Sequence, residues 1–204
     1  MKKFYKCLFF TFIFCFFIFI GSSVEANSIS SINMDIHIDN YGNANITEVW
    51  NCNTTQGTEV YHPYYNLGNS EIKNFTVSEG NTKYTNLNSW NTSASFDSKS
   101  YKNGINYISN GVELCWGISS YEKHIYTLNY TITNFVSQLE DYQMIYWTLI
   151  PYEFSNPIGS VYIKLYSDFS YDSETPVWGY GNYGGTCYVY DGYIEMRFRW
   201  KIKY

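Results

Sequence analysis

A carboxylate within an apolar stretch is the first feature of this chain that could carry chemistry. Glu48 lies in the run ANITEVWNC, in phase with Ile46 and Trp50 on the apolar side. Burial raises the pKa of an unpaired carboxyl, which is the usual mark of a general acid. With a second carboxyl about 5–10 Å away, Glu48 could act in glycoside hydrolysis, and the candidate partners are Glu59, Glu140 and Asp141. The alternative, which we favour, is a structural carboxylate that positions neighbouring groups or marks a β-bulge.

Other catalytic arrangements have little support in the sequence. His37, His62 and His124 are far apart and show no spacing typical of metal ligands. The chain also lacks the G-x-S-x-G elbow of serine hydrolases, in which the nucleophilic serine is held on a sharp turn. We therefore predict a protein that is not an enzyme, with no catalytic residues, no metal and no cofactor.

A glycine pattern near the end of the chain has the spacing of a dinucleotide-binding loop. The run GYGNYGG, residues 179–185, matches G-x-G-x-x-G. Such a loop needs a buried strand before it and a helix after it, whereas SETPVW precedes this one and the strand-like TCYVYDG follows it. We therefore predict no nucleotide binding, and a wide turn in which glycine tolerates positive φ.

Aromatic residues near that turn indicate binding instead. Exposed aromatic rings on a rigid β scaffold stack on sugar rings or act as hot spots for proteins. The predicted ligand-binding residues are Trp178, Tyr180 and Tyr183 beside the turn, and Trp90 in a polar stretch. The predicted function is binding or interaction with a protein or glycan. The alternatives are a carbohydrate-binding module or adhesin, and a glycan-acting hydrolase that uses Glu48.

The N-terminus predicts export from the cytoplasm. Residues 1–26 combine the basic start MKKFYK, an apolar run from Cys7 to Ile20, and small residues at Val24 and Ala26. This is the pattern of a signal peptide cleaved after Ala26. The apolar run is shorter than the roughly 20 residues that span a bilayer, although an uncleaved anchor is the alternative. We expect an extracytoplasmic protein, secreted or held at the outer surface of the cell membrane.

The remaining residues, 27–204, are enough for a single domain with one core. Loss of the leader leaves 10 basic against 17 acidic residues, a net charge of −7, which argues against nucleic acid as a partner. The three cysteines that remain are Cys52, Cys115 and Cys187. They allow at most one disulfide, whose pairing is open, and we favour the alternative that they are free thiols in strands.

Strand patterns fill this domain, and no helix signal exceeds one turn. Residues alternate between apolar and polar in SINMDIHID and HIYTLNYTITNF. Asn110-Gly111 and Asp191-Gly192 predict hairpin turns. The result is an all-β chain, which predicts an antiparallel β-sandwich, with a β-barrel as the alternative.

Three finer expectations follow from the same patterns. The apolar run YQMIYWTLIP predicts a central strand buried on both faces. The polar stretch 88–104 predicts a long loop. The alternation from Ile194 to Ile202 predicts an edge strand with a basic outer face, for which contact with a membrane or polyanion is the functional alternative.

Three segments, in their order and spacing, resemble a known family. DIHIDNYGNANITEVW, GTEVYHPYYNLGNSEIKNFTVS and LCWGISSYEKHIYTLNYTITNFV resemble the domain of unknown function 2207 family of predicted membrane proteins, over roughly residues 30–196. The resemblance implies an immunoglobulin-like β-sandwich outside the cytoplasm, held at the membrane, with no catalytic residues. Family members continue into a transmembrane helix. This chain ends in RFRWKIKY, so we expect a C-terminal truncation before such a helix.

Overall fold

The computed structural model describes residues 27–151, 156, 158–169, 171, 174–178 and 185–199. Within these residues the chain forms strands and one short helix. In chain order they are β1 (Ser28–Ile38), β2 (Ala44–Asn53), β3 (Glu59–Tyr65), β4 (Ile72–Glu79), β5 (Thr82–Lys83), β6 (Thr85–Asn86), α2 (Phe96–Lys99), β7 (Lys102–Ile108), β8 (Gly111–Gly117), β9 (Lys123–Ile132), β10 (Val136–Gln138), β11 (Gln143–Ile145), β12 (Ile158–Ser167), β13 (Thr186–Tyr190) and β14 (Tyr193–Arg199).

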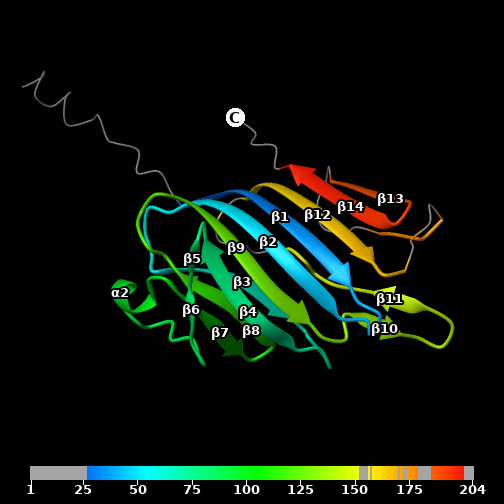
Figure 1. Ribbon diagram of the computed structural model, residues 1–204, viewed down its shortest axis with the longest axis horizontal. Helices are drawn as coiled ribbons and strands as arrows, with labels where there is room; N and C mark the ends of the chain where they lie inside the picture. Colours follow the sequence, from blue (N-terminus) through cyan, green and yellow to red (C-terminus); the bar gives the residue numbers. More distant parts are fainter. Residues whose placement is uncertain are drawn as a thin grey trace, which may run out of the picture.

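The strands form a large sheet, a smaller sheet and a two-stranded ribbon. The large sheet has eight strands in the order β13-β14-β12-β1-β2-β9-β4-β5, and the smaller one has four in the order β3-β8-β7-β6. The strands β10 and β11 pair only with each other among the described residues. Figure 1 shows the long strands β1, β2, β9 and β12 side by side, with β7 and β8 farther from the viewer.

The core lies between the large eight-stranded sheet and the small four-stranded sheet. Along β9, every second residue from His124 to Ile132 is buried, while the residues between them are exposed or half-buried. The same alternation occurs in β1 and β2, as expected for strands with one solvated face. Trp50 of the large sheet meets Trp116 of the small sheet edge to face, with ring centroids 5.3 Å apart, so the two inner faces pack directly against each other.

The predicted all-β sandwich is confirmed, but its sheets are mixed. The strands β1 and β12 pair in parallel, and so do β6 and β7. The purely antiparallel arrangement was therefore a wrong expectation. The barrel alternative is also excluded for the described strands, because the large sheet runs from β13 to β5 without closing.

Both predicted hairpins are confirmed, although the first turn is Ser109-Asn110 and not Asn110-Gly111. Gly111 begins β8 directly after the turn from β7, and Gly192 joins β13 to β14 with φ of +88°. A third turn joins β1 to β2, where the Asp39 carboxylate accepts hydrogen bonds from the backbone N–H groups of Tyr41 and Asn43. Short Asx-type bonds of this kind reverse the chain and set the register of the hairpin.

Two finer expectations were wrong, and a third was correct only in part. The run YQMIYWTLIP contributes only β11, and Met144 and Tyr146 within it are 40% and 80% exposed, because its one partner is the short strand β10. The stretch 88–104 is irregular from residue 88 to 95, as predicted for a long loop, but it also contains α2 and the start of β7. The C-terminal run was predicted to be an edge strand. The part of it that the structure describes forms β14, which lies between β12 and β13 and is therefore not at an edge.

Several expectations fall on residues outside the described ranges. These are the leader 1–26, the turn residues 179–184 and the last residues 200–204. Among the helices of the described residues, none has the length and apolar character needed to cross a membrane.

Candidate functional site

Glu48 lies at the centre of a buried polar cluster between the two larger sheets. Its side chain is fully buried and accepts hydrogen bonds from Trp50 Nε1, at 2.6 Å, and from the Tyr130 hydroxyl. His62 of β3 reaches it from the opposite sheet, with Nδ1 3.1 Å from Glu48 Oε1. The hydroxyls of Tyr64 and Tyr130 lie 2.5 Å apart. The carboxylate therefore joins the two sheets through hydrogen bonds.

The charges within this cluster compensate each other. Burial alone would raise the pKa of Glu48, but the positive charge of His62 and the hydrogen bonds from His62, Tyr130 and Trp50 outweigh it and lower that pKa. The Nε2 atom of His62 lies 3.0 Å from the carbonyl oxygen of Leu149. Both ring nitrogens therefore face oxygen atoms of the protein. Glu48 and His62 form a buried pair within ion-pair distance.

The tyrosines of the cluster stay neutral donors. Burial, together with the negative charge of Glu48, raises the pKa of Tyr64 and of Tyr130 well above the ordinary value. The sequence correctly indicated that Glu48 is buried. It did not indicate its partners, since His62 and Tyr130 are 14 and 82 positions away. The three candidate partner carboxylates do not appear among its contacts, and Glu140 and Asp141 are exposed.

An ion pair between Lys99 and Glu59 accounts for the burial of Trp90. Lys99 at the end of α2 is 2% exposed, and its Nζ lies 2.7 Å from Glu59 Oε2. The same carboxylate oxygen accepts the Trp90 indole N–H at 2.5 Å. Trp90 is only 6% exposed, so the exposed aromatic expected at this position is absent and the ring packs in the interior.

Of the other predicted binding residues, only Trp178 can be placed. Trp178 is 72% exposed, whereas Tyr180 and Tyr183 fall outside the described residues. The cysteines Cys52, Cys115 and Cys187 are free thiols, and burial raises the pKa of Cys52 to about 12, helped by the charge of Glu79. No group of three His, Cys, Asp or Glu side chains in the described part of the chain is placed to hold a metal ion.

The face of the large sheet turned away from the small one, hereafter the outer face, carries a different set of residues. Strand pairing aligns these residues in rows that cross the strands. One row reads Tyr190, Tyr193, Tyr166, His37, Asn45 and Thr131. The next row reads Tyr188, Glu195, Lys164, Asp35, Thr47 and Asn129. The rows are thus rich in tyrosine over β12 to β14, and in amides and hydroxyls over β1, β2 and β9.

A hollow of about 360 Å³ lies on the amide-rich part of the outer face. Its lining includes Asp35, His37 and Tyr166 on one side and the Asn45, Thr47, Asn129 and Thr131 side chains on the other. Thr47 donates a hydrogen bond to Asn129 Oδ1 at 2.9 Å, and Thr131 donates one to Asn45 Oδ1 at 3.0 Å. These cross-strand bonds fix the orientation of the two amides.

A β-bulge forms one wall of the hollow. The register between β4 and β9 shifts between Lys73 and Thr76, and Asn74 at the bulge has φ of +57°. Asparagine is among the few non-glycine residues that adopt this left-handed conformation readily. The irregularity brings Asn74 to the lining of the hollow. Bulges often redirect a side chain beside a functional site in this way.

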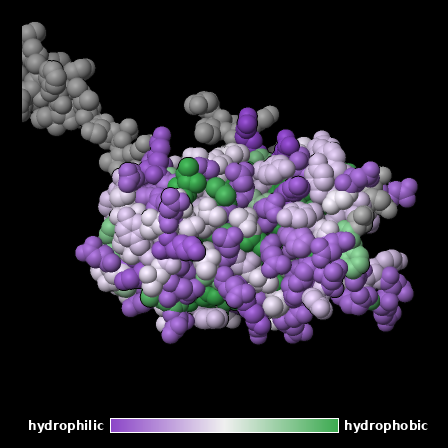
Figure 2. Space-filling view, viewed as in Figure 1, coloured by the Kyte–Doolittle hydropathy of each residue, from purple (hydrophilic) through white to green (hydrophobic). Residues whose placement is uncertain are grey.

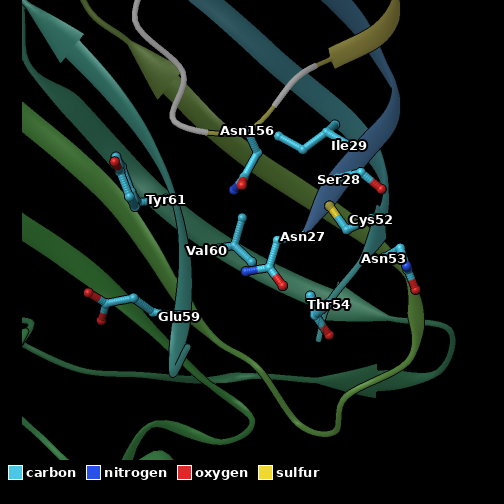
Figure 3. Close-up of a pocket in the computed structure, with 10 residues that line it drawn as sticks. All are labelled: Asn27, Ser28, Ile29, Cys52, Asn53, Thr54, Glu59, Val60, Tyr61 and Asn156. Atoms are coloured by element: carbon cyan, nitrogen blue, oxygen red, sulfur yellow. The ribbon is translucent and has the colours of Figure 1, made fainter. Parts of the chain in front are cut away.

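Another cavity is too small to hold a substrate. Figure 3 shows it where the start of β1, the end of β2 and β3 come together. Its volume is about 40 Å³, whereas ligand sites are commonly about 300–1,000 Å³. In Figure 3 the Glu59 carboxylate points away from Asn27 and Val60, in keeping with its bonds to Lys99 and Trp90. The cavity has room for water only.

No protein-family model matches the sequence, and none of the curated proteins is similar to it. Solved structures with a weak similarity to this chain include a candidate nutrient-binding protein from Legionella pneumophila. It has 12% identity and a TM-score of 0.49, over 87% of this chain and 64% of that one. An M1 zinc metallopeptidase from Deinococcus radiodurans has 10% identity and a TM-score of 0.35, over 87% and 40% of the two chains. A candidate protease from Parabacteroides distasonis has 10% identity and a TM-score of 0.39, over 86% and 36%. The chain thus spans less than two thirds of each neighbour, and similarities this low carry no information on function.

Proposed function

We propose that this chain is a non-enzymatic binding domain of a bacterial envelope protein, and that its contact surface is the outer face of the large sheet. The observation that carries the proposal is the hollow of about 360 Å³ on that face, a volume within the usual range of ligand sites. Its side chains are fixed by cross-strand hydrogen bonds. A rigid β-sheet that holds polar groups in place loses little conformational entropy when a ligand binds.

The burial of Glu48 supports a non-enzymatic role. A general acid must come within hydrogen-bond reach of the substrate, yet Glu48 is enclosed between the sheets and bonded to Trp50, His62 and Tyr130. Its pKa is lowered, the opposite of what a general acid near neutral pH requires. These contacts favour the structural interpretation over the hydrolase alternative.

The leader and the family resemblance support a location outside the cytoplasm. Signal peptides direct proteins to export, and the resemblance to the domain of unknown function 2207 family implies a place at the membrane surface, with the membrane as a partner of the full-length form. In the view of Figure 2, hydrophilic residues dominate the visible side of the molecule and hydrophobic ones form small patches. That side therefore suits contact with a polar ligand.

Sedimentation with isolated bacterial cell walls tests the proposed surface. We expect the protein to pellet with the walls, and Thr47→Arg to reduce the bound fraction, because a long cation would fill the hollow. The matched control is Asn106→Arg, since Asn106 bonds across strands to Glu113 at 2.6 Å on the small sheet, away from the hollow. Equal loss in both variants, or no pelleting of the wild type, would contradict the proposal. Release of reducing sugar by the wild type would contradict its non-enzymatic part.

A further inference from the structure

We propose that the outer face binds a neutral polysaccharide whose chain crosses the strands, from the hollow to the tyrosine-rich strands β12 to β14. This inference rests on the proposed function and names the ligand class of the same surface. Three properties of the outer face support it: the hydrogen-bonding groups of the hollow, the balance of charges around it, and the direction of its rows.

The hollow offers donors and acceptors together. The Asn129 and Asn45 oxygens accept from Thr47 and Thr131, so each Asn amide keeps two N–H donors for a ligand. From the part of the chain that the structure describes, the Asp35 carboxylate accepts one bond, from the Tyr166 hydroxyl at 2.9 Å, and it has further acceptor positions. Sugar hydroxyls both donate and accept, so adjacent hydroxyls of one ring match such a mixed set.

Charged groups of both signs lie close together on the outer face, where Asp35 is the cross-strand neighbour of Lys164. Glu195 bonds to Arg197 at 2.7 Å, and His37 to Asp168 at 2.9 Å. The ammonium of Lys164 lies over the rings of Tyr166 and Tyr193, 5.3 and 5.0 Å from their centroids. A strongly charged polymer would meet groups of both signs along its length. The balance therefore favours an uncharged ligand over a polyanion.

The rows provide an extended track. Neighbouring strands lie about 4.8 Å apart, which is close to the length of one pyranose unit, so a glycan crossing the sheet would place about one ring over each strand. At the far end of the row, Tyr190 stacks on Tyr193 with centroids 4.9 Å apart, and Tyr190 is 42% exposed. Aromatic rings of this kind contact the apolar faces of sugars while their hydroxyls stay wet.

The test is affinity gel electrophoresis of the full chain in gels that contain one soluble polymer each. The neutral polymers are mixed-linkage β-glucan, galactomannan and dextran, and the anionic polymer is polygalacturonate. We expect at least one neutral polymer to retard the protein and polygalacturonate not to. The double variant Asn45→Ala/Asn129→Ala, and Tyr190→Ala separately, should weaken the retardation about tenfold, as expected for the loss of one or two good contacts.

Two further variants keep the test decisive. Asn74→Gly suits the positive φ at the bulge and removes one amide from the hollow, so it should weaken binding without unfolding the protein. Asn106→Ala is the matched control and should bind as the wild type does. Retardation by no neutral polymer would overturn the inference, and so would equal binding by the wild type and all outer-face variants.

The outcomes separate this inference from the proposed function. If polygalacturonate alone retards the protein and the outer-face variants abolish that effect, the surface is correct and the neutral glycan is wrong. If a neutral polymer binds and only Asn106→Ala weakens the binding, the binding surface lies elsewhere, and both proposals fail.

Discussion

At the scale of single residues, Glu48 shows how a group that looks catalytic can be structural. It is a carboxylate on an apolar face, as a general acid would be, but the neighbouring sheet supplies His62 as a counter-ion. Removing one member of a buried ion pair leaves the other charge uncompensated, at a cost of about 3–5 kcal/mol. The cluster therefore makes a specific prediction for stability.

We expect Glu48→Gln to lower the free energy of unfolding by about 3–5 kcal/mol, because His62 loses its counter-ion while its ring stays buried. Urea unfolding at neutral pH, followed by tryptophan fluorescence, measures the change. The double variant Glu48→Gln/His62→Gln should be less destabilised than the sum of the two single variants, since it removes both charges. Strict additivity would show that the two side chains do not interact.

The lowered pKa of Glu48 also leads to a prediction of how stability depends on pH. Its folded-state pKa lies below the ordinary value of 4.5, so its contribution is fully present above that pH and is lost as the pH falls through the folded-state value. We expect the free energy of unfolding to fall as the pH drops below 4.5, and to fall less steeply in Glu48→Gln. Exposed Glu71 and buried Glu195 also have lowered pKa values and contribute to the slope that remains. Parallel slopes in the two proteins would contradict this role of Glu48.

At the scale of elements, local patterns predicted the hairpins and long-range pairing stayed hidden. Asn110-Gly111 indicated the β7–β8 hairpin, although the turn itself is Ser109-Asn110. Gly111 begins β8, where an added Cβ would lie 2.0 Å from the Tyr64 carbonyl oxygen. Nothing local indicates that β12 pairs in parallel with β1, about 130 positions earlier. The Glu48 partners and the rows of the outer face depend on the same distant pairings. In the strands that alternate cleanly the sequence could therefore predict which residues are buried, but it could not predict the surface that we propose as the site.

Close packing of α2 against β8 leads to the next prediction. A Cβ atom added at Gly117 would lie 1.9 Å from the backbone carbonyl oxygen of Lys99, and backbone atoms cannot move aside as a flexible side chain can. We expect Gly117→Ala to lower the free energy of unfolding by about 1–3 kcal/mol, measured by urea unfolding. The comparison variant is Gly104→Ala, whose Cβ would lie 3.3 Å from its nearest neighbour. A larger loss in Gly104→Ala would contradict the packing of α2 on β8.

At the scale of the whole molecule, the proposed location can be tested through the junction between the leader and the first strand. The Asn27 side chain accepts hydrogen bonds from the backbone N–H groups of Thr55 and Gln56, at 2.7 and 3.1 Å, and β1 follows at Ser28. Cleavage after Ala26 would leave these contacts intact, so the mature protein would keep the described fold.

We therefore expect the protein, when expressed with its leader in a bacterial host, to appear outside the cytoplasm with Asn27 as its first residue. Mass spectrometry of the isolated protein measures this directly. Ala26→Phe should block processing, because signal peptidase requires small residues at the cleavage site, and the unprocessed chain should stay with the membrane fraction. The control Asn27→Ser keeps a small polar residue after the site and should be processed normally. A wild-type protein that retains residues 1–26 at the membrane would instead identify the leader as an uncleaved anchor.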